Sequence, residues 1–168
     1  MPGSGKSTVG KQLGKRLGWV FEDADARIEA RIGGSIREFF EREGEDAFRA
    51  IEAEVIAQLA QQPACVLATG GGAVLREANR DALRRHCDVV YLRCAPEELY
   101  RRLRNDTQRP LLQVADPLGR LREMHAQRDP LYRQVAHLSV ETGRQTVPSQ
   151  VNMILSHLEL AGIVKLRP

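Results

Sequence analysis

The residues nearest the start of the chain whose types and spacing suit chemistry are Gly3-Ser4-Gly5-Lys6-Ser7-Thr8. They match the second half of the phosphate-binding pattern Gly-x4-Gly-Lys-Ser/Thr. Glycines let backbone N–H groups curl around phosphate oxygens, the Lys6 ammonium reaches a transferred phosphoryl group, and the Ser7 hydroxyl ligates Mg²⁺. The alternative is a Gly-Ser linker before a helix, and the first glycine of the pattern would fall just before Met1. The run therefore predicts a nucleotide phosphate site with an incomplete loop.

Two aspartates follow the apolar segment Trp19-Val20-Phe21, whose composition is typical of a short strand. We expect Asp23 and Asp25 to take separate tasks at the end of this strand, one facing a metal ion and the other a substrate hydroxyl. The alternative is a pair of solvated loop carboxylates. A later apolar run ends in Thr69 rather than in the aspartate that often assists Mg²⁺ there. Asp23 is therefore the acidic candidate for the metal.

Three consecutive glycines and several arginines indicate a small anionic substrate. Gly70-Gly71-Gly72 follows the apolar run 65–68, where it either forms a simple turn or lets a substrate approach the backbone closely. Arg109 and Arg128 stand near prolines, and the guanidinium fork suits carboxylates and phosphates. Arginines are dense between 84 and 133, although a solvated helix face explains more than half of them individually.

The elements that must hold these residues alternate between helices and strands. Apolar residues at helical spacing predict helices, and short continuous apolar runs predict strands buried on both faces. The alternation predicts an α/β fold in three layers, with a parallel sheet flanked by helices and ligands at the carboxyl ends of the strands. Helices are expected from the glycine loop to Leu17, over 26–32, from Ser35 past Phe40, from Gly44 to Leu59, from Pro96 past Leu103, over about 118–136 and through 151–158, and strands over 19–21, 65–68, 89–92 and 138–140.

Length and composition indicate one ordinary globular domain. The chain has 168 residues, of which 42% are hydrophobic and 28% charged, and this excludes disordered and collagen-like classes. The net charge of +3 comes from 25 basic and 22 acidic residues that are spread through the chain. Because the two signs are not segregated, the charge total does not indicate a nucleic-acid partner. The segment 105–117 is polar and aperiodic and contains two prolines, so we expect a mobile loop there.

No apolar run approaches the roughly 20 residues of a membrane helix, and the first residues lack the apolar core of a secretory signal. We therefore expect a cytoplasmic protein without a membrane partner. The three cysteines, Cys65, Cys87 and Cys94, fall into no metal-binding spacing and are expected to be free thiols.

The conjunction of motifs along the chain resembles the shikimate kinase family. The matching pieces are GSGKSTVGKQL, FEDADARIE, SIREFFEREGEDAFRAIE, ATGGGAV, RPLL and RDPLY, in the order and at the spacing of that family. Together they extend over nearly the whole chain. The resemblance implies a P-loop fold, a single kinase domain over 1–168, a shikimate-binding region at about 24–52 and a lid at about 105–117.

The same resemblance implies a role for each matching residue. ATP phosphates would lie on the loop Gly3 to Thr8 with Lys6, and Mg²⁺ would be held by Ser7 and, through water, by Asp23. Asp25 would contact the shikimate ring hydroxyls and act in catalysis with Lys6 and Arg109, the lid arginine. Arg49 and Arg128 would bind the substrate carboxylate, and Gly70, Gly71 and Gly72 would form the floor of the substrate pocket. Arg102 and Arg144 would lie beside the adenine. Phe40 and Phe48 would form the pocket wall, although packing in the core explains these two residues nearly as well.

These implications lead to one expected activity and two alternatives. The expected enzyme transfers a phosphoryl group from ATP to the 3-hydroxyl of shikimate, with Mg²⁺, as a monomer. Another small-molecule kinase, such as a gluconate kinase, is the alternative from the same class, but gluconate kinases share the glycine loop alone. A nucleotide-binding module without catalysis is the alternative from a different class, because the phosphate loop is incomplete.

One departure from the family pattern concerns the sheet. A strand normally leads into the phosphate loop and lies at the centre of the parallel sheet, and no such strand precedes Gly3 in this sequence. We expect its absence to leave a gap between the neighbouring strands. An additional expectation is that about ten native residues, with apolar β-formers and then a glycine, precede Met1.

Overall fold

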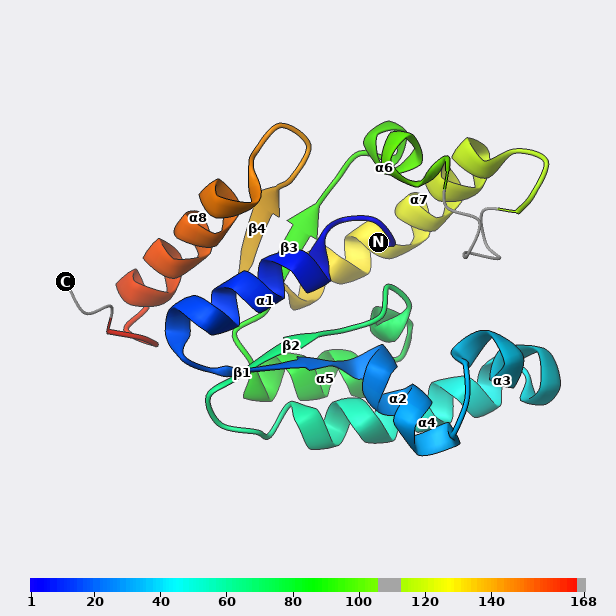
Figure 1. The fold of residues 1–168 in the computed structure, drawn as a ribbon, viewed down its shortest axis with the longest axis horizontal. Helices are drawn as coiled ribbons and strands as arrows, with labels where there is room; N and C mark the ends of the chain where they lie inside the picture. The colour runs from blue at the N-terminus through cyan, green and yellow to red at the C-terminus, as the bar shows by residue number, and fades with distance from the viewer. Residues whose placement is uncertain (106–112, 166–168) are drawn as a thin grey trace.

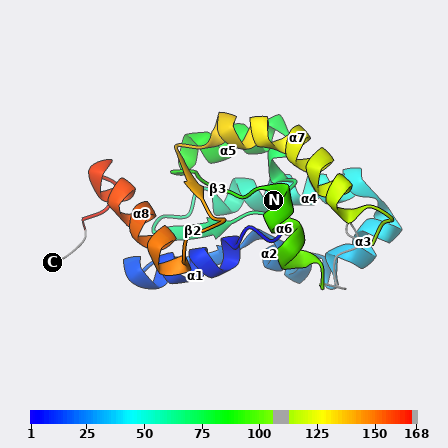
Figure 2. The same ribbon diagram turned by 90° about the horizontal axis from the view of Figure 1, so that it is seen from above.

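The computed structural model describes residues 1–105 and 113–165 and has three layers, with strands between two layers of helices (Figures 1 and 2). Most helices and strands occur where the sequence predicts them, because the spacing of apolar residues and the residues that begin and end helices indicate the same boundaries. Ser35 accepts a hydrogen bond from the Glu38 backbone N–H at 3.1 Å and begins a helix, and Gly33 ends the preceding helix at a φ of 72°. The elements are α1 (Lys6–Leu17), β1 (Val20–Asp23), α2 (Ala24–Ile32), α3 (Ile36–Glu43), α4 (Glu45–Leu59), β2 (Cys65–Ala68), the 3-10 turn η1 (Ala73–Leu75), α5 (Glu77–His86), β3 (Val90–Arg93), α6 (Pro96–Leu103), α7 (Pro117–Val135), β4 (Leu138–Glu141) and α8 (Val147–Leu160).

The strands form two separate parallel pairs. β1 pairs with β2, with Val20 opposite Cys65, and β3 pairs with β4, with Val90 opposite Leu138. Within the described residues no ladder joins the two pairs. The expected gap in the sheet is therefore present, and it lies between β2 and β3.

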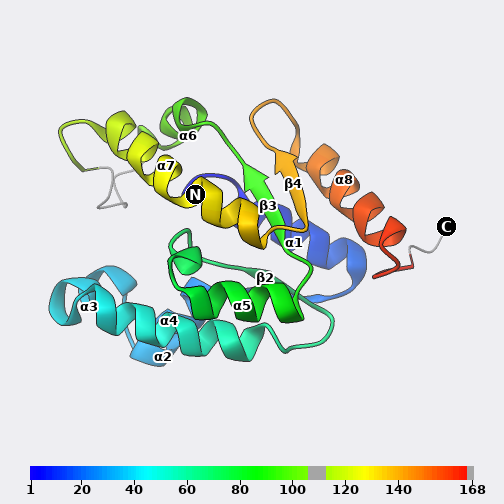
Figure 3. The same ribbon diagram turned by 180° about the vertical axis from the view of Figure 1, so that it is seen from behind.

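The two helical layers are formed by different sets of helices. α1 packs on β1 and β2 and also against α8, so these two helices form one layer. α4, α5 and α7 form the other layer, which Figure 3 shows from behind. The largest apolar cluster joins α1, α8 and the second strand pair through Val9, Leu13, Leu92 and Val140, together with four residues of α8. A second cluster, centred on Ile28 and Phe48, holds α2, α3 and α4 together at the other end of the molecule.

The strands next to the gap are less buried than the sequence predicts. Of the four residues of β2 only Ala68 is buried, and in β3 only Tyr91 and Leu92 are. The expectation of strands buried on both faces is therefore wrong for β2. The physical reason is that one edge and part of each face of this strand adjoin an open apolar space rather than another strand.

The three cysteines are free thiols, as expected. In the part of the chain that the structure describes, no helix is both long and apolar enough to span a bilayer.

Candidate active site

The phosphate loop adopts a conformation that only glycine reaches without strain. Gly3 and Gly5 have φ values of 74° and 90°, and α1 begins directly after Gly5. No side chain caps the first turn of α1, so its backbone N–H groups are available to an anion. Ser4 is buried and its Oγ donates to the Met1 carbonyl oxygen at 3.0 Å, which closes the loop on itself. The loop residues predicted from sequence thus come together around one helix N-terminus, with Thr8 exposed in its first turn.

Lys6 folds back over this loop. Its Nζ donates to the Met1 carbonyl oxygen at 2.7 Å and lies 3.4 Å from the Ser4 Oγ. The ammonium group is therefore held above the helix N-terminus, where a bound phosphate would meet both the positive charge and the backbone donors.

Ser7 and Asp23 are neighbours in space. The Ser7 Oγ donates to Asp23 Oδ2 at 3.2 Å, across the junction between α1 and the end of β1. The other carboxylate oxygen of Asp23 accepts the backbone N–H of Asp25 at 3.0 Å and so caps α2. A hydroxyl and a carboxylate beside a phosphate site are the hard oxygen ligands that Mg²⁺ takes when its other positions are water and phosphate. No group of three or more His, Cys, Asp or Glu side chains placed to hold a metal ion occurs in the described ranges.

Asp25 faces a different group of residues because it lies on α2 and not on the strand. Residues two apart on a strand share one face, so the helix start at Ala24 separates the two carboxylates. A Cβ placed on Gly70 would lie 3.0 Å from Asp25 Oδ1, so this carboxylate rests against the first glycine of the triple-glycine run. Burial raises the pKa of Asp25, and the negative charge of Asp23 raises it further.

Arg49 lies against the third glycine of the run. A Cβ on Gly72 would lie only 2.3 Å from Arg49 Nη2, so no other residue fits at Gly72 while the guanidinium keeps its place. Arg49 Nη1 donates to Glu52 Oε1 at 2.7 Å, and the guanidinium lies 5.1 Å from the centre of the Phe48 ring. Sequence reasoning missed Glu52, although its spacing of three residues from Arg49 on α4 was a signal for a pair on one helix face.

Arg128 completes the arginine pair from the opposite side. It projects from α7, and a Cβ on Gly71 would lie 3.4 Å from its Nη1. Tyr132, one helical turn later, donates its hydroxyl to the Gly71 carbonyl oxygen at 2.5 Å and fixes the glycine backbone. Both arginines have a buried Nε that donates no hydrogen bond within the described residues. Both side chains are half-buried, and Arg49 Nε also lies 3.5 Å from a Glu45 carboxylate oxygen. Two half-buried guanidinium groups beside a glycine backbone are suited to a bound carboxylate.

The arginines that the sequence assigns to the nucleotide differ in their contacts and exposure. Arg102 donates to the Gly3 carbonyl oxygen at 3.3 Å and to the Thr142 carbonyl oxygen at 2.8 Å, so it ties the phosphate loop to the segment after β4. Arg144 is exposed in that same segment. Arg109 lies outside the described residues, as does most of the expected lid.

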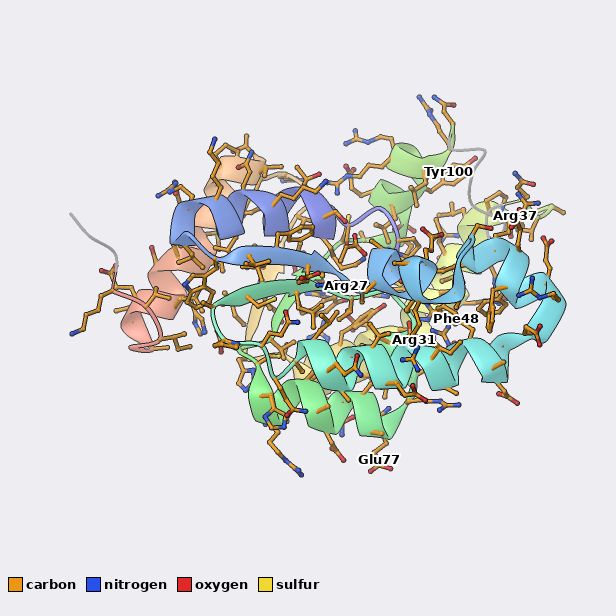
Figure 4. The ribbon with its side chains drawn as sticks, turned by 60° about the horizontal axis from the view of Figure 1, so that its bottom comes forward. Arg27, Arg31, Arg37, Phe48, Glu77 and Tyr100 are labelled. Atoms are coloured by element: carbon orange, nitrogen blue, oxygen red, sulfur yellow. The ribbon has the colours of Figure 1, made fainter. Side chains whose placement is uncertain are left out.

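The phenylalanines of the expected pocket wall are mainly core residues. Phe40 and Phe48 pack with ring centres 5.1 Å apart, and Phe48 is 4% exposed. In Figure 4 Phe48 lies among α2, α3 and α4. Arg27 and Arg31 of α2, also labelled there, pair with Glu22 of β1 and Glu54 of α4.

Glu52 gives a pH-dependent prediction. It is 1% exposed, and burial raises its pKa more than the hydrogen bond from Arg49 lowers it. The folded chain therefore binds this proton more tightly than the unfolded chain, so the contribution of Glu52 to the free energy of unfolding falls as the pH rises above about 4.5. Glu52→Gln removes that contribution. The stability of the variant relative to wild type should rise between pH 5 and pH 7.5 in urea unfolding.

The matched control is Glu159→Gln, on the exposed end of α8. Its unfolding free energy should stay parallel to that of wild type over the same range. Parallel curves for Glu52→Gln as well would contradict the assignment of a raised pKa.

Fold and site together define the class of protein: a P-loop α/β kinase in which the carboxyl ends of β1 and β2 bring the phosphate loop next to the triple-glycine run and its two arginines. The sequence family described as shikimate kinase matches residues 2–159. A shikimate kinase of Paracidovorax citrulli is 57% identical over 97% of this chain and 91% of that protein. One of Ralstonia nicotianae is 52% identical over 96% of this chain and 85% of that protein.

Solved structures agree with the sequence matches. A shikimate kinase from Acinetobacter baumannii in complex with shikimate superposes with a TM-score of 0.90 at 43% identity, covering 97% of this chain and 90% of that one. One from Bacteroides thetaiotaomicron gives a TM-score of 0.87 at 31% identity, over 94% of each chain. The chain belongs to the shikimate kinase family, which confirms the resemblance, the P-loop fold and the expected class of enzyme.

Proposed function

We propose that this protein transfers the γ-phosphoryl group of ATP to the 3-hydroxyl of shikimate, giving shikimate 3-phosphate and ADP in the synthesis of chorismate and the aromatic amino acids. The observation that carries the proposal is the pair of half-buried arginines, Arg49 and Arg128, which lie against Gly72 and Gly71 and each have a buried Nε without a hydrogen-bond partner in the described residues. The nearby Asp25 supplies a carboxylate for a ring hydroxyl. A carboxylic acid with neighbouring hydroxyls matches these groups in charge and in hydrogen-bonding type.

The two arginines would bind the shikimate carboxylate and fix the ring against Gly70, Gly71 and Gly72. Asp25 would then accept a hydrogen bond from the attacking hydroxyl and take its proton as the new ester bond forms. The raised pKa of Asp25 supports this role, because a base works best when its pKa approaches the working pH. Glu52 holds Arg49 in position from behind.

The phosphate loop would bind ATP from the other side of Asp25. Backbone N–H groups of residues 3–8 and the Lys6 ammonium would hold the phosphates and stabilise the negative charge that develops on the moving phosphoryl group. Arg102 and Arg144 would lie beside the adenine, and Arg109 would approach the phosphates from the lid at about 105–117. Ser7 and Asp23 would hold Mg²⁺, which neutralises phosphate charge when bound.

The domain organisation and setting are part of the proposal. We assign 1–168 to one kinase domain, with the shikimate-binding region at about 24–52, where α2, α3 and the first half of α4 share one apolar cluster. We assign the protein to the cytoplasm as a monomer, acting on a small molecule and on neither nucleic acid nor membrane.

The metal assignment predicts a specific effect of Asp23→Asn. Asparagine still accepts the capping hydrogen bonds of α2 but lacks the negative charge, so the helix should stay intact while Mg²⁺ binds more weakly. The Mg²⁺ concentration that gives half-maximal turnover should rise by about 10-fold, the effect of roughly 1.4 kcal/mol. A titration of activity against free Mg²⁺ measures this, with Asp46→Asn on the exposed start of α4 as control. An unchanged midpoint would remove Asp23 from the metal site.

A coupled ADP-release assay tests the function itself. With ATP and Mg²⁺ the protein should turn over shikimate and leave gluconate and nucleoside monophosphates unreacted. Turnover of gluconate alone would indicate another small-molecule kinase. Binding of ATP without turnover of any acceptor would indicate a nucleotide-binding module.

A further inference from the structure

The helix that carries Arg128 has a weak point beside this residue. Pro130 lies inside α7, two residues after Arg128, and has no backbone N–H to donate to the Ala126 carbonyl oxygen. Within α7, which the structure describes throughout, no residue between Met124 and Val135 is fully buried. The position of this turn therefore depends on contacts that hold it from outside the helix.

One such contact joins the turn to β3 through Tyr91. The Tyr91 hydroxyl donates to Asp129 Oδ1 at 2.8 Å, and Tyr91 is 5% exposed. The other carboxylate oxygen of Asp129 accepts from Arg133 Nε at 2.7 Å. Burial acts to raise the pKa of Asp129, but the hydrogen bonds from Arg133 and Tyr91 outweigh it and hold that pKa below its ordinary value. Asp129 is therefore ionised at neutral pH and accepts both hydrogen bonds.

Tyr91 also contacts the residue that fixes the glycine run. The ring centres of Tyr91 and Tyr132 are 4.9 Å apart, and the Tyr132 hydroxyl donates to the Gly71 carbonyl oxygen at 2.5 Å. A Cβ on Gly71 would lie 3.4 Å from Arg128 Nη1. A single buried side chain of β3 thus touches both Asp129, the chain neighbour of Arg128, and the tyrosine that holds the glycine opposite Arg128.

The alternative role for Asp129 is an ion pair along α7. Arg133 lies four residues later with about half of its side chain exposed, and exposed pairs of this kind contribute little to stability. The bond to Tyr91 differs in two ways. It joins the helix to a strand, and it is donated by a buried hydroxyl to the turn that also carries Arg128.

We propose that Tyr91 and Asp129 are positioning residues for the substrate carboxylate: their hydrogen bond holds the turn of α7 in the place from which Arg128 reaches a carboxylate bound beside Gly71. This inference rests on the proposed function, in which Arg128 binds the carboxylate of shikimate. Both residues act through Arg128 and not on the transferred phosphoryl group. Their hydrogen bond therefore strengthens the binding of shikimate and leaves the transfer step unchanged.

Tyr91→Phe removes the hydroxyl and keeps the ring that packs on Tyr132. Loss of positioning weakens ground-state and transition-state binding alike, so we expect KM for shikimate to rise by about 5–10-fold while kcat and KM for ATP stay near their wild-type values. Asp129→Ala should have the same effect, and the double variant should be no worse than either single variant, because both remove one bond. Asp129→Asn keeps an oxygen for the Tyr91 hydroxyl and should lie close to wild type.

The matched control is Arg133→Gln, which removes the exposed partner of Asp129 and leaves the bond to Tyr91. Its KM for shikimate should stay near that of wild type. A further measurement repeats Tyr91→Phe in an Arg128→Gln background, where binding no longer depends on the position of a guanidinium. There Tyr91→Phe should leave KM unchanged, whereas a rise by the same factor would overturn the proposal because the effect would not pass through Arg128.

The remaining outcomes separate this inference from the proposed function. If the wild type phosphorylates shikimate and KM is unchanged in both Tyr91→Phe and Asp129→Ala, the positioning role is overturned and the proposed function stands. Equal rises of KM in Tyr91→Phe and Arg133→Gln would also overturn the positioning role, because any loss at Asp129 would then have the same effect. If the wild type turns over no shikimate, the proposed function fails and the positioning role fails with it.

Discussion

Asp25→Asn should lower kcat for shikimate phosphorylation by about 10²–10⁴-fold, the usual effect of removing a general base. Asparagine keeps the size of the side chain and its hydrogen-bonding oxygen but cannot take the proton of the attacking hydroxyl. Asp25 rests against Gly70 and belongs to α2 rather than to the loop that would hold ATP, so KM for ATP should stay near its wild-type value. Steady-state kinetics with each substrate varied in turn measures both quantities.

Asp46→Asn is the matched control, because Asp46 is an exposed carboxylate in the first turn of α4. Its kcat should equal that of wild type. Nearly unchanged kcat in Asp25→Asn would refute the proposed role and leave positioning by the arginines as the source of the rate.

Lys6→Met is the second variant with a large expected effect. The Lys6 ammonium lies above the N-terminus of α1, where its charge would stabilise the transferred phosphoryl group, and methionine fills a similar volume without charge. We expect kcat to fall by about 10²–10³-fold, as when one preorganised donor is removed from a transition state. The melting temperature should change little, because Lys6 is only half-buried.

The control is Lys15→Met, which removes a charge from the exposed last turn of the same helix. Activity should be retained in this variant. A loss of activity in both variants would show that general charge, and not the position above the loop, is what matters.

The element pattern could be predicted from sequence because its signals are local. The helix from Gly44 to Leu59 and the strand over 65–68 depend on apolar period and on flanking glycines, and both occur where expected. The phosphate loop and the Ser7–Asp23 contact follow from one motif and one strand end. Most arginines between 84 and 133 are also as expected, since pairs such as Arg101 with Glu98 and Arg122 with Glu97 lie on exposed helix faces.

What sequence reasoning missed depends on contacts between distant segments. Nothing near Tyr132 shows that its hydroxyl fixes the Gly71 carbonyl, 61 residues away. Nothing near Glu52 shows that α2 and the glycine run bury it beside Asp25, which contributes to its raised pKa. The separation of Asp23 from Asp25 depends on where α2 begins, and helix boundaries are the least certain part of a sequence pattern.

The most direct test of the proposed activity is the identity of the phosphorylated product. The protein is incubated with ATP, Mg²⁺ and shikimate, and the mixture is followed by ³¹P and ¹H NMR. We predict that each ADP formed is accompanied by one phosphate ester, with its phosphorus coupled to the proton on carbon 3 of shikimate. ADP that appears with inorganic phosphate in place of an ester, or an ester on another hydroxyl, would contradict the proposed arrangement of Asp25, Arg49 and Arg128 around the substrate.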